Sequence, residues 1–270
     1  MSTTDLTENQ ADSRRRPVGA LAQLIRCDNP GPMELDGTNT WVLQAPGADT
    51  CVVVDPGPDG HPAHLEAVAA GRTVELVLIT HGHADHVAGL DEFRALTGAP
   101  ARAFDVQNCR EADPLVHDEE FVAAGLAFQV LHTPGHTGDS VSFVVSHPLD
   151  RLLLAGDTVL GRGTTVLGED PPALRHYLES LELLTSLGGA RLLPGHGPDH
   201  PDVRPVLAEY RAHRQQRIAA IRALLRRNRL SPRDADPEAI ADELYADTPP
   251  GARFAAILSV RAQLAYLSGE

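Results

Sequence analysis

The stretch THGHADH, Thr80–His86, places three histidines and one aspartate within six residues, from His81 to His86. Each imidazole is costly to bury without a partner, because it gives up its hydrogen bonds to water. A cluster of this density therefore indicates a shared ligand. Imidazole and carboxylate groups without cysteine suit borderline divalent metals such as zinc. The spacing also differs from HExxH, in which two histidines four residues apart lie on one face of a helix.

Three further apolar runs lead to a histidine or an aspartate. The run AFQVLHTPG is followed by His136, RLLLAGDT contains Asp157 and ARLLPGHG contains His196, while VELVLIT runs directly into the first cluster. Each run is short, apolar and closed by glycine or proline, which predicts a strand and a turn. Strand ends gather at one edge of a layered sheet, where sites are commonly built. We therefore expect these groups to converge in one site.

The candidate metal ligands are too many for one tetrahedral ion, which takes four. Two divalent ions that share a carboxylate accommodate the whole set. Zinc is the expected metal, with iron and manganese as alternatives. The candidate ligands are His81, His83, Asp85, His86, His136, Asp157 and His196.

The order of elements predicts a layered α/β (α+β) domain followed by a helical region. Apolar strands alternate with helical stretches that end in glycine up to about residue 202, and the pattern is helical from there on. We expect a disordered lead-in over residues 1–19, a catalytic domain over 20–202 and a C-terminal helical domain over 203–270.

The formal net charge of −14 argues against binding of a polyanion by the whole surface. One segment is basic, because residues 203–230 hold eight arginines and one acid, Glu209. Such a helix is usually a solvated face, but its arginines could also contact phosphates. The chain has no apolar run of the about 18 residues that span a bilayer. It also lacks the pattern of a secretory signal. We expect a cytoplasmic protein with no membrane partner and with reduced cysteines at Cys27, Cys51 and Cys109.

The motifs HGHADH, TPGHT, AGDT and PGHG, in this order, resemble the metallo-β-lactamase fold superfamily over about residues 20–200. This resemblance implies a four-layer αβ/βα sandwich with the site at one edge of its two sheets. It further implies a first ion held by His81, His83 and His136. A second ion would be held by Asp85, His86 and His196. Asp157 would bridge the two ions.

Three stretches outside the metal motifs are similar to the β-lactamase-like protein 2 subgroup. They are CDNPGPMELDGTNTWVL, HTPGHTGDS and HRQQR at His213–Arg217. The resemblance implies a small, winged-helix-like C-terminal domain, and one mitochondrial member of the subgroup is an endoribonuclease that cuts single-stranded RNA. It also places Asn39, in GTNTW, near the metal site.

The ligand set predicts a hydrolase. Hydroxide held in a dinuclear site needs no protein nucleophile, and the sequence contains no GxSxG elbow. Asp85 is the candidate catalytic residue, because it would orient the hydroxide and accept or relay its proton. The expected partner is a small-molecule substrate, namely an ester, thioester or lactone. Single-stranded RNA, cut by an endoribonuclease, is the alternative.

Two other functions are less favoured. The β-lactamases proper usually lack the last histidine of HxHxDH, which is His86 here. A non-enzymatic nucleic-acid-binding protein would not need the intact ligand set. A homodimer is compatible with the sequence.

The remaining histidines match no position of the family motifs. We expect His132 at a strand end, where it lies either behind a ligand or outside the site. The other histidines are expected on the surface or on helices, and they are His61, His64, His117, His147, His176, His200 and His213.

Overall fold

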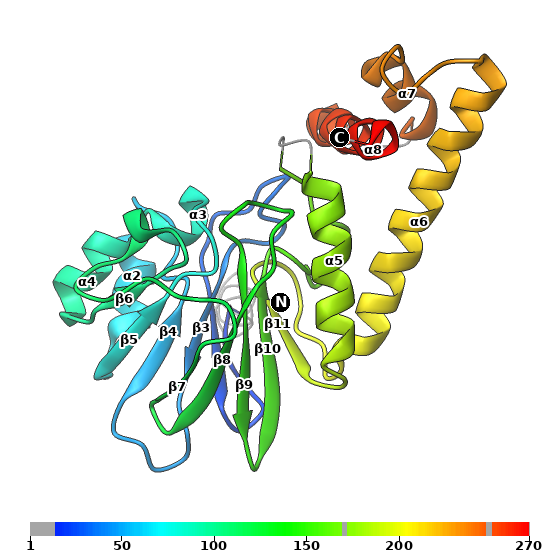
Figure 1. Ribbon diagram of the computed structural model, residues 1–270. Helices are drawn as coiled ribbons and strands as arrows, with labels where there is room; N and C mark the ends of the chain where they lie inside the picture. The colour runs from blue at the N-terminus through cyan, green and yellow to red at the C-terminus, as the bar shows by residue number, and fades with distance from the viewer. Residues whose placement is uncertain (1–13, 169–171, 247–249, 270) are drawn as a thin grey trace, which may run out of the picture.

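The structure, a computed structural model, describes residues 14–168, 172–246 and 250–269 of the chain. The described residues form two β-sheets packed face to face, with helices on both outer sides (Figure 1). A helical region follows at the C-terminal end. The predicted four-layer α/β sandwich is therefore confirmed.

The first sheet of the described chain has six strands in the order β1-β2-β3-β4-β5-β6. Strands β1 to β4 pair antiparallel, whereas β5 and β6 run parallel to β4. Helices connect the parallel strands, as a crossover requires. The strands are β1 (Arg15–Val18), β2 (Ala22–Arg26), β3 (Asn39–Leu43), β4 (Cys51–Val54), β5 (Val74–Leu78) and β6 (Ala101–Arg102).

The second sheet of the described chain has five strands in the order β11-β10-β9-β8-β7. Strands β7 to β10 form an antiparallel meander, and β11 pairs parallel to β10 after a helical crossover. The strands are β7 (Glu120–Ala123), β8 (Leu126–His132), β9 (Val141–His147), β10 (Asp150–Gly156) and β11 (Arg191–Pro194).

Helices cover the outer face of each sheet (Figure 1). Helices α2 and α4 pack on the first sheet, and α5 with the start of α6 packs on the second. None of the helices in the described ranges is long and apolar enough to cross a membrane. The helices are α2 (Pro62–Ala69), α3 (Ala84–Val87), α4 (Leu90–Thr97), η1 (Val106–Asn108), α5 (Ala173–Ser186), α6 (Val203–Asn228), α7 (Pro237–Leu244), η2 (Pro250–Ala252) and α8 (Arg253–Ser268).

Successive side chains of a strand point to opposite faces of the sheet. They therefore pack either into the core between the two sheets or into the core beneath the outer helices. Val52 and Val54 of β4 point into the core between the sheets, whereas Val53 packs on the other face beside Leu65 of α2. Leu153 of β10 likewise turns away from its two neighbours and joins the helices over the second sheet. Strands buried on both faces read as continuous apolar runs, which is why the sequence predicted them.

The N-terminal prediction is wrong in part. Arg15–Val18 lies within the predicted disordered lead-in of residues 1–19, yet it pairs antiparallel with β2 as an edge strand. Only Val18 of this strand is buried, so its arginine-rich sequence carries no apolar alternation that would indicate a strand. Residues 1–13 lie outside the described residues.

The C-terminal region is helical, as predicted. Its own core joins the second half of α6 to α7 and α8, with Ile221, Leu225, Ile240 and Val260 among the buried side chains. Every regular element described between residues 203 and 269 is a helix, and no β-hairpin wing is among them. The winged-helix-like character of this region therefore stays a prediction.

Candidate metal centre

The THGHADH cluster lies directly after β5, at one edge of the first sheet. His81 follows the strand, His83 is the N-cap residue of α3, and Asp85 and His86 lie within that four-residue helix. His81 and His86 are buried, whereas His83 and Asp85 are more exposed. The irregular backbone between strand and helix turns all four side chains toward one point.

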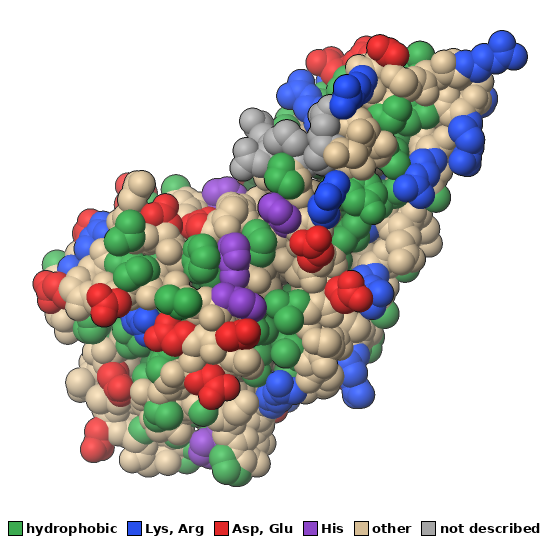
Figure 2. Space-filling view, viewed as in Figure 1, with side chains coloured by type: hydrophobic (Ala, Val, Ile, Leu, Met, Phe, Trp, Pro, Cys, Tyr) green, Lys and Arg blue, Asp and Glu red, His purple; other side chains and the backbone are tan. Residues whose placement is uncertain are grey.

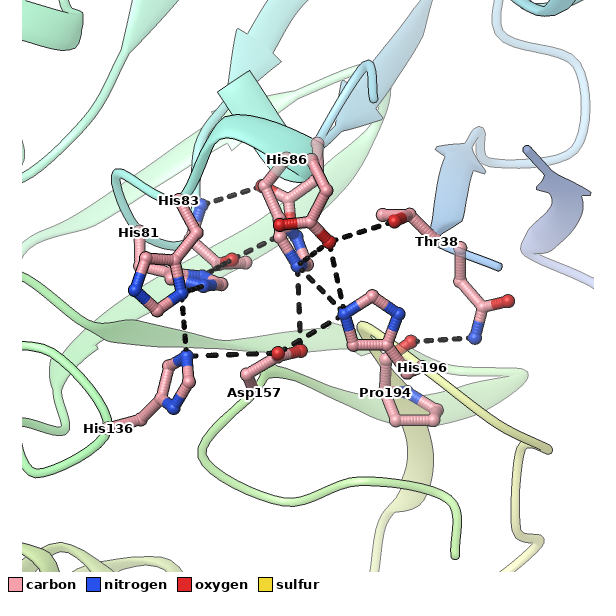
Figure 3. A network of polar contacts seen from close by, with 12 residues as sticks. Thr38, His81, His83, His86, His136, Asp157, Pro194 and His196 are labelled. Atoms are coloured by element: carbon pink, nitrogen blue, oxygen red, sulfur yellow. Dashed lines mark hydrogen bonds and ion pairs between the residues drawn. The ribbon is translucent and has the colours of Figure 1, made fainter. Parts of the chain in front are cut away.

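The three other predicted ligands come from the second sheet. His136 lies in the loop between β8 and β9, Asp157 follows β10 directly, and His196 follows β11. Figure 3 shows His136 beside His81 and His83, His196 near His86, and Asp157 between the two groups. The structure thus brings together all seven residues that the motifs predicted, although 115 positions separate His81 from His196 in the sequence.

Backbone hydrogen bonds join the two sheets at this edge. The Val141 N–H donates to Thr80 O at 2.8 Å, and the Asn39 N–H donates to Gly195 O at 2.8 Å. Gly195 is required here, because a Cβ atom would lie 2.3 Å from Asp157 Oδ1. The glycine of the PGHG motif therefore lets the backbone approach the centre closely.

Hydrogen bonds set the tautomer of His81. The Thr80 hydroxyl donates to Asp55 Oδ2 at 2.7 Å, so its oxygen accepts the proton of His81 Nδ1 at 3.0 Å. The Nε2 atom of His81 is then left with a lone pair. That atom lies 3.1 Å from His83 Nδ1.

His136 is oriented in the same way. Its Nδ1 atom donates to Val166 O at 2.7 Å, which leaves a lone pair on Nε2. This Nε2 atom lies 2.9 Å from His83 Nδ1. His83 Nδ1 carries at most one proton and so cannot satisfy the lone pairs of both His81 and His136. Three converging imidazole nitrogens fit a cation better than they fit one another.

The second group shows the same convergence with carboxylates added. His86 Nδ1 donates to Asp55 Oδ2 at 2.9 Å, which directs its Nε2 atom toward Asp85 Oδ2 at 3.3 Å and His196 Nε2 at 3.3 Å. His196 Nε2 also lies 3.2 Å from Asp157 Oδ2. The Asp157 Oδ1 atom is buried and accepts no hydrogen bond from the described residues.

Electrostatics in this half of the centre also favour a cation. Burial raises the pKa of the Asp157 carboxyl, but His196 and His86 outweigh burial and hold that pKa well below its usual range. Burial lowers the pKa of His86, but Asp157 and Asp55 outweigh it and raise that pKa well above normal. The pKa of His196 is raised to about 9, because Asp157 outweighs the opposing effect of burial. In the metal-free protein, protons on His86 and His196 balance the buried carboxylates, and a divalent cation bound here would take the place of these protons.

The first half of the centre is less charged. Burial lowers the pKa of His81 well below its usual value, and burial likewise lowers the pKa of His136. Both imidazoles therefore stay neutral, which is the form that binds metals.

The donor set fits two divalent ions. Ligand atoms within 4.8 Å of one another form a group of His81, His83 and His136 and a group of Asp85, His86 and His196. A tetrahedral ion with bonds of ~2.1 Å separates its ligands by about 3.4 Å, close to the contacts above. A third such combination, His81, His86 and Asp157, lies between the two groups, where a bridging carboxylate belongs.

Three residues hydrogen-bond to the candidate ligands or to their supports, and the sequence did not predict this role for them. The first is Asp55. Asp55 supports His86 and Thr80, and its backbone adopts a positive φ of 53° at the end of β4. Carboxylates in this position fix the ring of a metal-ligating histidine. The only signal in the sequence is the DPG turn after an apolar strand, which resembles an ordinary turn.

Thr38 and Asn29 are the other two, and together they position Asp85. The Thr38 hydroxyl donates to Asp85 Oδ2 at 2.9 Å, and Asn29 receives the Thr38 N–H at 2.9 Å. Asn39 was predicted near the metal site, and its buried side chain donates to Pro194 O at 3.0 Å and Gly197 O at 2.9 Å. It thereby holds the turn on both sides of His196.

The remaining histidines lie outside the ligand groups. His132 ends β8 as predicted, donates to Gly138 O at 2.8 Å and stacks on Phe104. It therefore supports the loop that carries His136. His64 lies on a helix, α2, as predicted, but it is buried rather than exposed.

His64 is expected to make stability depend on pH. Burial lowers its pKa to about 4, whereas the unfolded chain titrates near 6.5, so the unfolded state binds the proton first. The contribution of neutral His64 to the free energy of unfolding is complete above about pH 6.5. It is lost as the pH falls toward about 4, and the total loss is about 3 kcal/mol. We expect His64→Gln to be destabilised at neutral pH, and this deficit to shrink by about 2 kcal/mol at about pH 5.

Urea unfolding of both proteins at the two pH values measures this difference. The exposed His176 on α5 supplies the matched control, His176→Gln. A deficit that stays constant with pH would contradict the assignment to His64.

Comparison with known proteins agrees with this geometry. The metallo-beta-lactamase superfamily profile matches residues 33–196. The chain therefore belongs to the metallo-beta-lactamase superfamily, and it is an enzyme of the metal-dependent hydrolase class. The predicted resemblance and the prediction of a hydrolase are confirmed.

Particular relatives cover most of the chain. A beta-lactamase-like protein 2 homolog from Caenorhabditis elegans is 32% identical over 251 residues, 88% of this chain and 81% of the relative. An atrochrysone carboxyl ACP thioesterase from Aspergillus chevalieri is 32% identical over 211 residues, 76% of this chain and 66% of the relative. The crystal structure of a metallo-beta-lactamase family protein from Thermus thermophilus superposes with a TM-score of 0.72 at 25% identity, covering 92% and 93% of the two chains.

Proposed function

We propose that this enzyme hydrolyses small carboxylic thioesters or esters with an uncharged acyl group, lactones included. Two divalent ions serve the reaction, with zinc expected and iron or manganese as alternatives. The assignment of the seven predicted ligands to two ions, bridged by Asp157, is part of this proposal. The expected cytoplasmic location and homodimer stay predictions.

A cavity beside the candidate ligands carries this proposal. It has a volume of about 220 Å³, and His136 and Asp157 form part of its wall. Most of the other lining side chains are apolar or small, and Arg162 is the one lysine or arginine among the described lining residues. Arg162 is already paired with Asp36, with Nη2 2.9 Å from Oδ1. A neutral acyl group suits such a cavity better than a phosphodiester chain does.

When bound, divalent ions would lower the pKa of water toward neutrality and polarise the acyl oxygen. We assign to Asp85 the role of accepting or relaying the proton of that water. Thr38 holds its Oδ2 atom, while Oδ1 accepts no hydrogen bond from the described residues. In the overall reaction the oxygen of water joins the acyl carbon, the C–S or C–O bond breaks, and the leaving group takes up a proton. The carboxylic acid product releases its own proton to solvent.

The thioesterase from Aspergillus chevalieri supports this choice, because its name records acyl-thioester cleavage on a scaffold that matches 76% of this chain. The relationship does not identify the acyl group. The substrate is therefore proposed as a chemical class.

Endoribonuclease activity on single-stranded RNA is the alternative, favoured by the similarity to the beta-lactamase-like protein 2 homolog and by the arginines of α6. Several of these arginines are engaged within the chain. Arg204 pairs with Asp202, Arg227 pairs with Glu243, and Arg214 is buried. Figure 2 shows basic side chains gathered toward the far end of α6, away from the histidines near the middle of this face.

The test compares a neutral acyl thioester of N-acetylcysteamine with a labelled single-stranded RNA, using zinc-loaded protein. Asp85→Asn, prepared identically, is the matched control. Thioester hydrolysis by the wild type that is lost in the variant supports the proposal. RNA cleavage by the wild type alone, without thioester hydrolysis, selects the alternative, and RNA cleavage by both proteins means a contaminating nuclease.

A further inference from the structure

One face of helix α8 borders the cavity beside the candidate metal centre. Ala255, Ala256 and Ser259 of α8 and its N-cap residue, Ala252, contribute to the cavity wall. They are spaced three and four residues apart, so they lie on a single helix face. All four have small side chains, and this leaves the space that the cavity occupies.

An adjacent face of α8, which continues from Ala256, anchors the helix. Val260 and Leu264 are buried in the C-terminal core beside Ile221 and Leu225 of α6. The wall formed by α8 therefore belongs to a packed unit. Its small residues face the cavity, while its larger apolar residues hold it in place.

A second C-terminal side chain, Tyr245, also lines the cavity and is held firmly. The Arg217 guanidinium lies 4.6 Å from the centre of its ring, and Arg217 Nη1 donates to Leu244 O at 2.9 Å. The Tyr245 hydroxyl also accepts a hydrogen bond from Gln263 Nε2 at 3.2 Å. The C-terminal region thus supplies a preformed side of the cavity.

The catalytic domain supplies the facing wall. Met33 and Leu35 come from the loop before β3, and Leu160 and Val166 come from the segment after β10. These apolar side chains continue directly to His136 and Asp157. A group bound between the two walls would therefore extend from a carbonyl at the candidate metal centre.

The cavity size defines the occupant. A volume of about 220 Å³ lies below the roughly 300 Å³ at which pockets for drug-sized ligands begin. That is the size of a medium-length aliphatic chain. A terminal carboxylate or phosphate would find no free cation among the described lining residues, because Arg162 is bound to Asp36.

We propose that this cavity is the acyl-chain subsite and that the small-residue face of α8 sets the chain length accepted. The substrate class is then a thioester or ester of an unbranched, uncharged acyl chain of medium length, as judged from the cavity volume. This inference rests on the proposed acyl hydrolysis. It assigns specificity to the C-terminal helical region, while the catalytic domain carries the reaction.

The test uses N-acetylcysteamine thioesters of acetyl, butanoyl, hexanoyl, octanoyl and dodecanoyl groups, for which the leaving group is constant. We expect kcat/KM to rise from acetyl to hexanoyl or octanoyl and to fall for dodecanoyl. Ala255→Phe places a phenyl ring in the cavity and should lower the octanoyl-to-acetyl ratio of kcat/KM at least about tenfold. Ala265→Phe, on the same helix and outside the cavity lining, is the matched control and should keep the wild-type ratio.

Two further measurements keep the test independent of folding defects and of metal loading. Met33→Ala removes bulk from the opposite wall and should shift the preferred chain to a longer one. Calorimetric titration of metal-depleted protein with octanamide should show binding, weakened at least about tenfold by Ala255→Phe. A negative heat-capacity change would mark burial of the chain.

The outcomes separate this inference from the proposed function. Hydrolysis at one rate for all chain lengths, or an equal effect of Ala255→Phe and Ala265→Phe, overturns the subsite but leaves acyl hydrolysis in place. Octanamide binding without hydrolysis of any thioester or ester supports the apolar cavity and overturns the proposed reaction. Absence of both overturns both.

Discussion

Replacing Asp157 by alanine is expected to abolish most activity and to reduce the bound divalent ions from the proposed two per chain to one at most. The residue contacts both ligand groups, since its carboxylate lies 3.8 Å from His136 Nε2 and 3.2 Å from His196 Nε2. Its Oδ1 atom is buried and has no hydrogen-bond donor among the described residues. Loss of residues that only support ligands typically costs about 10- to 100-fold. We therefore expect loss of a bridging ligand to cost at least about a thousandfold.

The metal content of dialysed Asp157→Ala protein, measured by mass spectrometry, tests this prediction directly. The value of kcat/KM on the acyl thioester is the second measurement. Asp91→Ala is the control, because Asp91 is an exposed acid on α4 that pairs with Arg110. Two tightly bound ions together with full activity in Asp157→Ala would show that the bridging assignment is wrong.

Replacing Arg214 by alanine is expected to cost about 3 kcal/mol of the free energy of unfolding. Its side chain is 1% exposed although it belongs to the arginine-rich helix α6. Arg214 Nη2 donates to Thr165 O at 2.6 Å and to Thr164 Oγ1 at 3.1 Å, and the guanidinium lies 5.0 Å from the centre of the Tyr177 ring. Truncation leaves a cavity and deprives a buried carbonyl of its donor.

The same substitution is expected to weaken metal binding. Thr165 Oγ1 lies 3.2 Å from His136 Nδ1, and Val166 O accepts the proton of that nitrogen. Arg214 therefore fixes the segment that orients His136. We expect the affinity for the ion at His136 to fall about tenfold, as for other residues behind a ligand.

Arg214→Met separates the two effects, since it keeps much of the buried volume but removes the hydrogen bonds. We expect it to retain more stability than Arg214→Ala while losing similar metal affinity. Arg222→Ala, an exposed arginine on the same helix, should change stability by less than about 0.5 kcal/mol. Equal stability losses in Arg214→Ala and Arg222→Ala would refute the structural role of Arg214.

The candidate ligands were predicted from local sequence because each motif joins an apolar strand to a turn. Gly156 and Gly195 show why these motifs are recognisable. A Cβ atom on Gly156 would lie 2.6 Å from Thr80 Oγ1, and one on Gly195 would lie 2.3 Å from Asp157 Oδ1. The glycines therefore mark places where the backbone closely approaches the ligands. Because the steric requirement falls on the glycine itself, it is visible in the local sequence.

Supporting residues could not be predicted in this way. Asp55 lies 31 positions from His86, and Thr38 lies 47 positions from Asp85. Nothing in the composition around Asp55 or Thr38 differs from an ordinary turn or strand entry. Asp55 and Thr38 can support His86 and Asp85 only once two strands and a helix pack at the same edge of the first sheet.

The arginines of α6 show the same limit. Their spacing predicts a helix, and the sequence favours a solvated basic face, but Arg214 lies inside the molecule and Arg217 packs on Tyr245. Which arginine is buried depends on how the helix sits against the loop after β10. Helical periodicity does not contain that information.

By itself, the sequence determined the layered α/β class, the order of its main strands and the set of seven candidate ligands, because strand period, turn sterics and metal-donor chemistry act within a few residues. The four-layer sandwich was implied by the family resemblance. Only the tertiary structure decided the edge strand β1, the tautomers imposed by Asp55 and Val166, the burial of Arg214 and the cavity against α8. These features depend on contacts between elements far apart in the chain. Their geometry is set by the packing of whole layers rather than by any local pattern.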